Sequence, residues 1–222
     1  MGVGLGSYVD KGGSNATGGV GYLQFLAPAL LVSTVMQGAA GEGTFPVLAG
    51  FRWVRRYYAM YATPLTPRAI AFGQLAWNAT HALMVGAICC LIIILFGAAA
   101  TPGILWSIPI GVLTGVAFSA PIAAFMTTQR DTDAWNNIWR FGITPLFLFS
   151  GTFFPIERLP ELIRPIAWIL PLWHGVDLAR SAALGTIGDN IPLAAAHVAI
   201  LAIVAVVGTW AMFVMYRREL EK

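Results

Sequence analysis

Charged side chains are scarce in this 222-residue sequence, and none occurs between Lys11 and Glu42 or between Arg68 and Arg130. Only 10% of the residues are charged, whereas an average soluble domain has about a quarter. This scarcity excludes an ordinary soluble domain. Hydrophobic residues make up 58% of the chain, and a helix needs about 20 mostly apolar residues to cross a bilayer. The charge-free runs therefore predict a multi-pass membrane protein.

Residue types that carry enzyme chemistry are also few. The two cysteines, Cys89 and Cys90, are adjacent in an apolar run, so they cannot form a disulfide framework and are interpreted as packing residues. Neither of the two lysines, Lys11 and Lys222, ends a phosphate-binding P-loop motif. The sequence contains no Gly-x-Ser-x-Gly elbow, no His-Glu-x-x-His pair and no cluster of metal-ligand residues. We predict no catalytic residue, no metal site and no cofactor in this chain.

The apolar runs predict an all-α integral membrane protein with about five spans. We place the spans at about Tyr22–Gly41, Ala69–Gly97, Ile104–Thr127, Phe141–Phe154 and Ile191–Tyr216. The fourth run is short for a full crossing, and a polar loop, TQRDTDAWNNIWR, is expected before it. The Gly-rich residues 1–21 are interpreted as an outer loop.

Lysine and arginine in the short loops predict the orientation, because cytoplasmic loops carry more of them. One side of the membrane receives nine basic residues and the other side four. The larger set places the C-terminus in the cytoplasm and the N-terminus outside, and we expect one more span to precede Met1. The larger set is Arg52, Arg55, Arg56, Arg68, Arg130, Arg140, Arg217, Arg218 and Lys222, and the smaller set is Lys11, Arg158, Arg164 and Arg180. We interpret the net charge of +3 as topology rather than nucleic-acid binding.

The segment FRWVRRYYAMYATPLTP, residues 51–67, combines three arginines with aromatic side chains. Its spacing predicts one amphipathic helix, with Phe51, Val54 and Tyr58 on the face opposite the arginines. Thr63–Pro67 would end this helix, because proline cannot continue it. Two compatible interpretations are open: the arginines contact anionic lipid head groups, or the segment docks onto a cytoplasmic partner.

Polar side chains also occur within the predicted second span. Gln74, Asn78 and His81 follow a spacing of i, i+4 and i+7, which places them on one helix face. Polar groups at membrane depth must be paired or face water. We therefore keep two interpretations, interhelical hydrogen bonding and the lining of a translocation path.

The segment before the last span, residues 156–184, predicts a short helical region at the outer surface. Leu159, Leu162, Ile163 and Ile166 favour an amphipathic helix. The charge-free piece Pro165–Val176 has 12 residues, too few to cross, so it is expected to be interfacial or re-entrant. Three polar residues then follow at i, i+3 and i+6 and are interpreted as a local ion pair with a hydrogen-bonded histidine, or as an outer gate: His174, Asp177 and Arg180.

Several of these segments together resemble a known family. YLQFLAPALLVSTVMQGAAGEGTFPVL with RRYYAMYATPLTPRAIAFGQLAW resembles the first half of an ABC-2 type transporter permease, and LFLFSGTFFPIERLPELIRPIAWILPLWHGVDLAR resembles the second half. The pattern is most similar to the nodulation lipooligosaccharide and drug exporter branch. MGVGLGSYV resembles the outer end of the family's first span, so most of that span is missing here.

The resemblance implies six spans in the family, a second permease subunit and a separate ATP-binding cassette ATPase that holds ATP and Mg²⁺. It also implies that the first cytoplasmic loop, residues 42–68, contains the element that docks onto the ATPase. The residues expected there are Glu42, Thr44, Phe45, Arg52, Arg55 and Arg56.

The function implied is export of an amphipathic cargo, such as a lipid-linked saccharide, a lipooligosaccharide or a hydrophobic drug, across the bacterial inner membrane. The alternative is a gradient-driven transporter or channel, which should carry paired ionisable residues within its spans. Only His81 and His197 are ionisable residues inside the predicted spans. A membrane scaffold or immunity protein without transport is a third interpretation.

Overall fold

The computed structural model describes residues 21–153, 168 and 170–222, and every element in these ranges is helical. The predicted outer loop and first-span remnant, apart from Gly21, lie outside the described residues, as does the amphipathic helix expected around Leu159–Ile166. In chain order the elements are α2 (Tyr22–Gly43), α3 (Phe45–Arg52), α4 (Arg56–Tyr61), α5 (Pro67–Leu95), η2 (Pro102–Trp106), α6 (Ser107–Thr128), α7 (Asp133–Asn137), η3 (Ile138–Ile143), α8 (Thr144–Phe149), α10 (Pro171–Leu184), η5 (Ile187–Asn190) and α11 (Ile191–Leu220).

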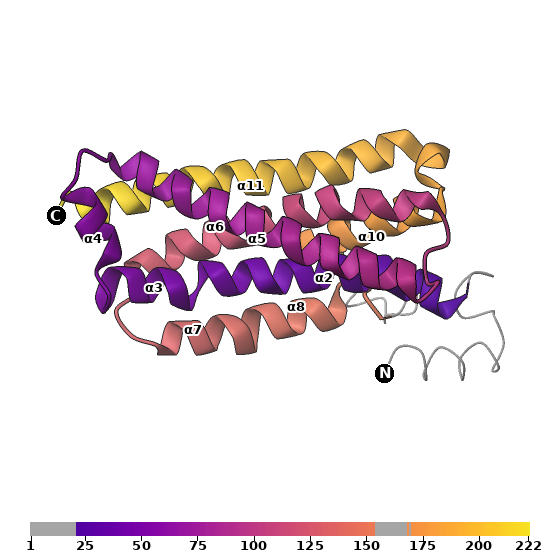
Figure 1. Cartoon of the computed structure of the whole chain (residues 1–222), viewed down its shortest axis with the longest axis horizontal. Coiled ribbons are helices and arrows are strands. Elements are labelled where there is room, and N and C mark those ends of the chain that lie inside the picture. Colours follow the sequence, from indigo (N-terminus) through magenta and orange to yellow (C-terminus); the bar gives the residue numbers. More distant parts are fainter. Residues whose placement is uncertain (1–20, 154–167, 169) are drawn as a thin grey trace.

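Four stretches in the described part are long and apolar enough to cross a bilayer: Tyr22–Arg52, Pro67–Leu95, Pro102–Thr128 and Ile187–Leu220. They lie side by side as an elongated bundle, with α3, α4 and the C-terminus at one end (Figure 1). α6 packs against α2, α5, α10 and α11 and forms the centre of the bundle. The bundle confirms the predicted all-α membrane fold and four of its spans.

Small residues allow the central helices to approach closely. Gly43 of α2 lies against the backbone of Ser119 in α6, where an added Cβ would be only 2.7 Å from the carbonyl oxygen. Gly208 of α11 lies against Pro121 of α6 in the same manner. Close packing of this kind drives helix association in lipid, where there is no hydrophobic effect between helices. The outward faces of α5 and α11 expose apolar side chains to the bilayer, among them Leu83, Ile88, Leu91, Ile203, Val206 and Val207.

The fourth predicted span differs from the expectation. Its helical path begins at Asp133, eight residues before the predicted start, and runs through α7, the π-helix η3 and α8 to Phe149. The expected polar loop is therefore wrong from Asp133 onward, and only Gln129–Thr132 connects α6 to this path. Pro145 has no backbone N–H to continue the helical ladder, and the wider π-turn that precedes it accommodates the missing bond.

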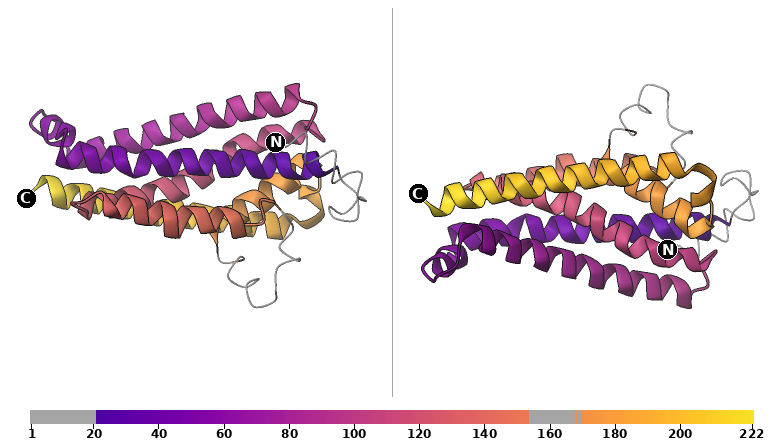
Figure 2. Two further views of the ribbon diagram at one scale, coloured as in Figure 1. Left: turned by 90° about the horizontal axis from the view of Figure 1, so that it is seen from below. Right: turned by 90° about the horizontal axis from the view of Figure 1, so that it is seen from above.

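α10 runs from the middle of the bundle back toward one end (Figure 2). Near its start, Gly175 lies against Val32 and Thr114, which are in the middle of α2 and α6. Near its end, the carbonyl of Ala183 accepts a hydrogen bond from Thr101, just before η2. Gly185 then adopts a left-handed conformation that ends the helix, and α11 starts the last crossing. α10 therefore starts at the level of the middle of α2 and α6, and whether Pro165–Val176 is interfacial or re-entrant stays a prediction.

The segment 51–61 is two short helices and not the single amphipathic helix that was predicted. α3 ends at Arg52, and Arg55 takes up a left-handed conformation with φ of 53° before α4 begins. The reversal brings the ring of Tyr57 to 4.5 Å from the ring of Phe51, and both rings contact Tyr216 of α11. A left-handed residue costs about 1–2 kcal/mol, which burial of this aromatic cluster offsets.

Candidate functional site

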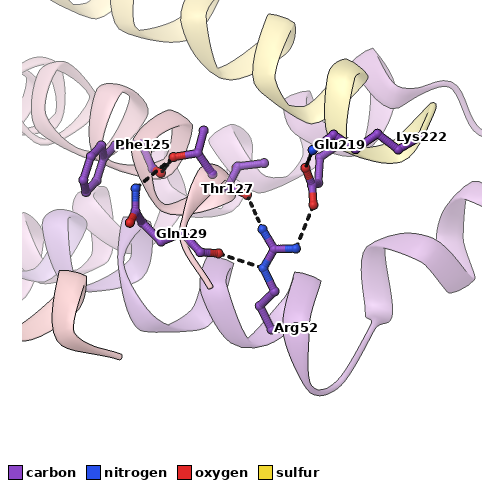
Figure 3. A network of polar contacts seen from close by, with 7 residues as sticks. Arg52, Phe125, Thr127, Gln129, Glu219 and Lys222 are labelled. Carbon is purple, nitrogen blue, oxygen red and sulfur yellow. Dashed lines mark hydrogen bonds and ion pairs between the residues drawn. The ribbon is translucent and has the colours of Figure 1, made fainter. Parts of the chain in front are cut away.

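Arg52 connects three helices at the end of the bundle that carries the C-terminus (Figure 3). Its Nη1 donates to Glu219 Oε1 of α11 at 2.7 Å. Its Nε donates to the carbonyl of Gln129 at 2.7 Å and its Nη2 to the carbonyl of Thr127 at 3.0 Å. These two carbonyls lie at the end of α6, where backbone acceptors have no partner within the helix. Lys222 also contacts the Glu219 carboxylate.

Arg56 begins a second polar chain, which leads into the membrane-spanning part of α5. Its Nη2 donates to the hydroxyl of Tyr57 at 2.8 Å, and that hydroxyl donates to Gln74 Oε1 at 2.8 Å. Gln74 Nε2 in turn donates to Asn78 Oδ1 at 2.9 Å. Gln74 and Asn78 are buried, and Gln74 bonds to another helix through Tyr57, whereas its bond to Asn78 lies within α5.

His81, the third residue of the predicted path, does not join this chain. Its ring lies against Gly38 of α2 and stacks on Trp77. A cavity of about 420 Å³ opens between α2, α4 and α5, and Glu42, Arg56, Gln74 and Trp77 contribute to its lining. The three residues of the predicted path thus lie on one side of α5, and only Gln74 reaches this cavity.

The first residues of the predicted docking loop lie at the junction of α2 and α3. Glu42 Oε2 accepts a hydrogen bond of 2.9 Å from Trp77 Nε1, and Thr44 is fully buried, with its hydroxyl bonded to the carbonyl of Gly41. Phe45 instead is 44% exposed. Of these three residues, Phe45 is the one with a large side chain exposed at the surface.

An aromatic surface that sequence reasoning missed surrounds Phe45. Its ring lies 5.8 Å from that of Trp53 and 5.7 Å from that of Trp135, measured between ring centroids. We call Phe45, Trp53 and Trp135 the aromatic patch. They come from α3, from the turn before α4 and from α7, so only the tertiary fold brings Trp135 to the other two. The number of tryptophans in the loops was the available signal, but it carried no information about their proximity.

The arginines of the loop have different positions. Arg52 and Arg56 are partly buried and bonded within the protein, whereas Arg55 is exposed. The interpretation that all three arginines contact lipid head groups is therefore wrong for Arg52 and Arg56, because their guanidinium groups bond to carbonyls and side chains of the bundle.

A histidine pair lies between the start of α10 and α11. His174 Nδ1 and His197 Nδ1 are 2.7 Å apart, and His197 Nε2 lies 3.3 Å from Asp177 Oδ2. Both imidazoles are buried, and the ring of Trp173 packs against them. The Asp177 carboxylate therefore lies beside His197 of α11, and the local ion pair predicted along α10 is wrong for this residue.

Arg180 connects α10 to other elements. Its Nη2 donates to the carbonyl of Gly151 at 2.9 Å, and its guanidinium lies 3.7 Å from the ring centroid of Phe25 in α2. The three residues of the predicted outer gate thus share α10 but make contacts in different directions, His174 and Asp177 toward α11 and Arg180 toward α2 and the end of α8.

Comparison with known proteins decides the family. The family model described as ABC-2 type transporter matches residues 4–184. The chain belongs to the ABC-2 type transporter family. It is a multi-pass membrane subunit of an ABC exporter, and members of this family are transport subunits.

Similar proteins place the permease in one branch of that family. It is 30% identical over 206 residues to nodulation protein J of Sinorhizobium fredii strain NGR234, covering 93% of this chain and 76% of that protein. It is 30% identical over 222 residues to nodulation protein J of Rhizobium leguminosarum bv. viciae, covering 100% and 83%. The same-named protein of Bradyrhizobium diazoefficiens is 29% identical over 220 residues, covering 99% and 81%. No solved structure matches the permease significantly.

Proposed function

We propose that the permease carries an amphipathic cargo out across the bacterial inner membrane, with its C-terminus in the cytoplasm. The cargo classes are lipid-linked saccharides, lipooligosaccharides and hydrophobic drugs. A separate ABC ATPase supplies the energy and holds ATP and Mg²⁺, and a second permease subunit, identical or different, completes the membrane part. The similarity to nodulation protein J supports the branch from which these cargo classes are inferred.

The observation that carries this proposal is the way in which α3 and α4 are attached to the long helices. Arg52, at the end of α3, bonds to α6 and α11, and Tyr57, in α4, bonds to α5. We infer that a displacement of α3 and α4 reaches these neighbours through the hydrogen bonds and packed side chains that join them. Movement of α3 and α4 by an ATPase therefore moves three membrane helices together.

The residues of the docking loop then divide into two roles. The aromatic patch contacts the ATPase, with Phe45 at its centre, and Arg55 adds an exposed positive charge beside it. Arg52, Arg56 and Glu42 hold the loop to the bundle through the bonds described above, and Thr44 occupies the buried junction. This division supports Phe45 as a contact residue, whereas Glu42 acts through Trp77.

In the proposed transport cycle α10 is the outer gate. It starts at mid-depth, ends at a left-handed Gly185 and is held to α11 by His174 and Asp177 and to α2 by Arg180. Gln74, Asn78 and His81 line one side of α5 and form the path on the cytoplasmic half. Outward opening separates α10 from α2 and α11, which hold it through Arg180 and through His174 and Asp177.

One observation favours the gradient-driven alternative. That function was expected to need paired ionisable residues in the spans, and His197 of the last span is paired with His174 and Asp177. Membership in the ABC-2 family weighs against it, because the energy source in this family is ATP on a partner. Purification of the permease distinguishes the two functions, since only one of them needs an ATPase partner.

A gentle-detergent pull-down of the tagged full-length chain from its native membrane, followed by mass spectrometry, tests the proposal. We expect a P-loop ATPase in about equal amount. Recovery of the permease without any ATPase, also after crosslinking, contradicts ATP-driven export and favours the gradient-driven alternative.

The docking role of the aromatic patch has its own test. The double variant Phe45→Ser and Trp53→Ser should leave the permease in the membrane but reduce ATPase recovery and transport. Trp106→Ser is the matched control, because Trp106 is 67% exposed in η2 at the other end of the bundle. Equal ATPase recovery with both variants contradicts docking at the patch.

A further inference from the structure

An open pocket of about 600 Å³ lies between the ends of α5 and α11, away from the aromatic patch. Arg68 of α5 and Arg217 and Arg218 of α11 contribute to its lining, although they are about 150 positions apart in the chain. Trp210 and Phe213 of α11 form the apolar part of the wall. The pocket therefore combines clustered positive charge with an apolar surface on the bilayer side of the bundle.

Most of the positive charge in this pocket is unneutralised. Arg217 Nε bonds to both carboxylate oxygens of Glu221, at 3.1 and 3.0 Å. The side chains of Arg68 and Arg218 make no hydrogen bond or ion pair with any residue in the described ranges, and both are exposed. With three arginines against one carboxylate, the pocket favours an anion. Guanidinium groups bind phosphate with two parallel hydrogen bonds, which makes arginine well suited to phosphate groups.

The apolar wall indicates that the anion carries a hydrocarbon part. Trp210 is 67% exposed and lies seven residues, or two helical turns, before Arg217 on the same face of α11. Two turns correspond to about 10 Å along the helix axis. Tryptophan is enriched at the level where head groups meet acyl chains. The arginines then lie at phosphate level, and Trp210 lies beside the first part of the acyl chains.

We propose that this pocket binds an anionic phospholipid, such as a phosphatidylglycerol, from the leaflet on the side of the C-terminus. Its phosphate lies between Arg68 and Arg218, and its acyl chains follow Phe213 and Trp210 along α11. A zwitterionic lipid fits less well, because its ammonium group would lie close to the same arginines. The lipid connects the start of α5 to the end of α11 and needs no ATPase partner.

Native mass spectrometry of the full-length permease in mild detergent tests this site. Phosphatidylglycerol and phosphatidylcholine with identical acyl chains are added in separate titrations, and inorganic phosphate is then added to the phosphatidylglycerol-bound permease. Each basic residue near a membrane surface contributes about 1 kcal/mol to anionic lipid binding, which corresponds to about fivefold in affinity. We expect phosphatidylglycerol to bind more tightly, and inorganic phosphate not to displace it.

The double variant Arg68→Gln and Arg218→Gln should reduce phosphatidylglycerol affinity by about 25-fold, from about fivefold for each arginine. Arg130→Gln is the matched control, because Arg130 is exposed at the same end of the bundle but does not line the pocket. Equal affinity of the unmodified permease for the two lipids overturns the proposal, whether or not the double variant folds. Displacement by inorganic phosphate, or an equal loss in the Arg130 variant, overturns it as well.

Discussion

Replacing Arg52 by methionine should loosen the C-terminal end of the bundle, because this side chain bonds to both α6 and α11. Methionine keeps most of the apolar stem and removes the guanidinium. The change leaves the Thr127 and Gln129 carbonyls without these donors, and it leaves Glu219 with Lys222 as its remaining cation. Glu219 is only 10% exposed at its side chain, so water replaces the lost partner incompletely.

The magnitude follows from three lost hydrogen bonds. A hydrogen bond that involves a charged group contributes about 1.5–3 kcal/mol, and loss of a partner from a buried ion pair costs about 3–5 kcal/mol. Arg52 is 20% exposed at its side chain, which lowers both contributions. We expect a loss of about 3 kcal/mol in the free energy of unfolding. For a chain of this length that lowers Tm by about 6–12 °C.

The assay is thermal unfolding of the purified permease in detergent, followed by size-exclusion chromatography of the protein that stays folded. Glu219→Gln and the double variant complete a double-mutant cycle, in which we expect a coupling energy of about 1–2 kcal/mol. Arg55→Met is the matched control, because the Arg55 side chain is exposed and makes no hydrogen bond or ion pair within the described ranges. This control should change stability by less than about 0.5 kcal/mol.

Two results would refute this reasoning. If Arg52→Met and Arg55→Met lower Tm equally, the loss reflects total charge and not the bonds of Arg52. If the cycle shows no coupling, the Arg52–Glu219 contact does not contribute to stability, and the attachment of α3 to α11 on which the proposed function depends is absent.

Three further changes test the helix packing, the histidine pair and the polar chain that begins at Arg56, all by the same thermal assay. Gly208→Ala places a Cβ 2.5 Å from Pro121 Cδ and should lower the free energy of unfolding by about 1–3 kcal/mol. Gly73→Ala, whose Cβ would have no neighbour within 4 Å, should be neutral or stabilising. A larger loss in the Gly73 variant than in the Gly208 variant contradicts the close contact. His197→Ala removes the partner of two polar side chains on α10 and should cost about 2–3 kcal/mol, and an unchanged Tm argues against that pairing. Tyr57→Phe keeps the ring but removes the hydroxyl between α4 and α5, so a loss of about 1–2 kcal/mol is expected, whereas no loss contradicts that bond.

Much of the architecture could be predicted from local sequence. The second predicted span, Ala69–Gly97, agrees with α5 at Pro67–Leu95, and the last, Ile191–Tyr216, begins where α11 begins. Such boundaries depend on where apolar runs meet prolines and capping residues, and these are neighbours in the chain. Thr66, for example, accepts a hydrogen bond from the N–H of Ala69 and caps α5.

Other local structure could not be predicted, because distant residues decide it. The left-handed Arg55 is stabilised by the contact of Tyr57 with Tyr216, a residue of the last helix. The helical start at Asp133 was interpreted as loop because its residues are polar. Its following turn packs against buried residues, as Ile138 contacts the main apolar core.

Composition and spacing along the chain are enough to predict a helical membrane protein, because two long runs without charge are stable as helices in the bilayer. The resemblance carried by its motifs agrees with the family that comparison establishes. The pairing of polar residues depends instead on how the helices pack. Arg52 and Glu219 are 167 positions apart, and His174 and His197 lie on different helices. Such pairs depend on the rotation and spacing of packed helices, which contacts such as Gly208 with Pro121 set and no local pattern encodes.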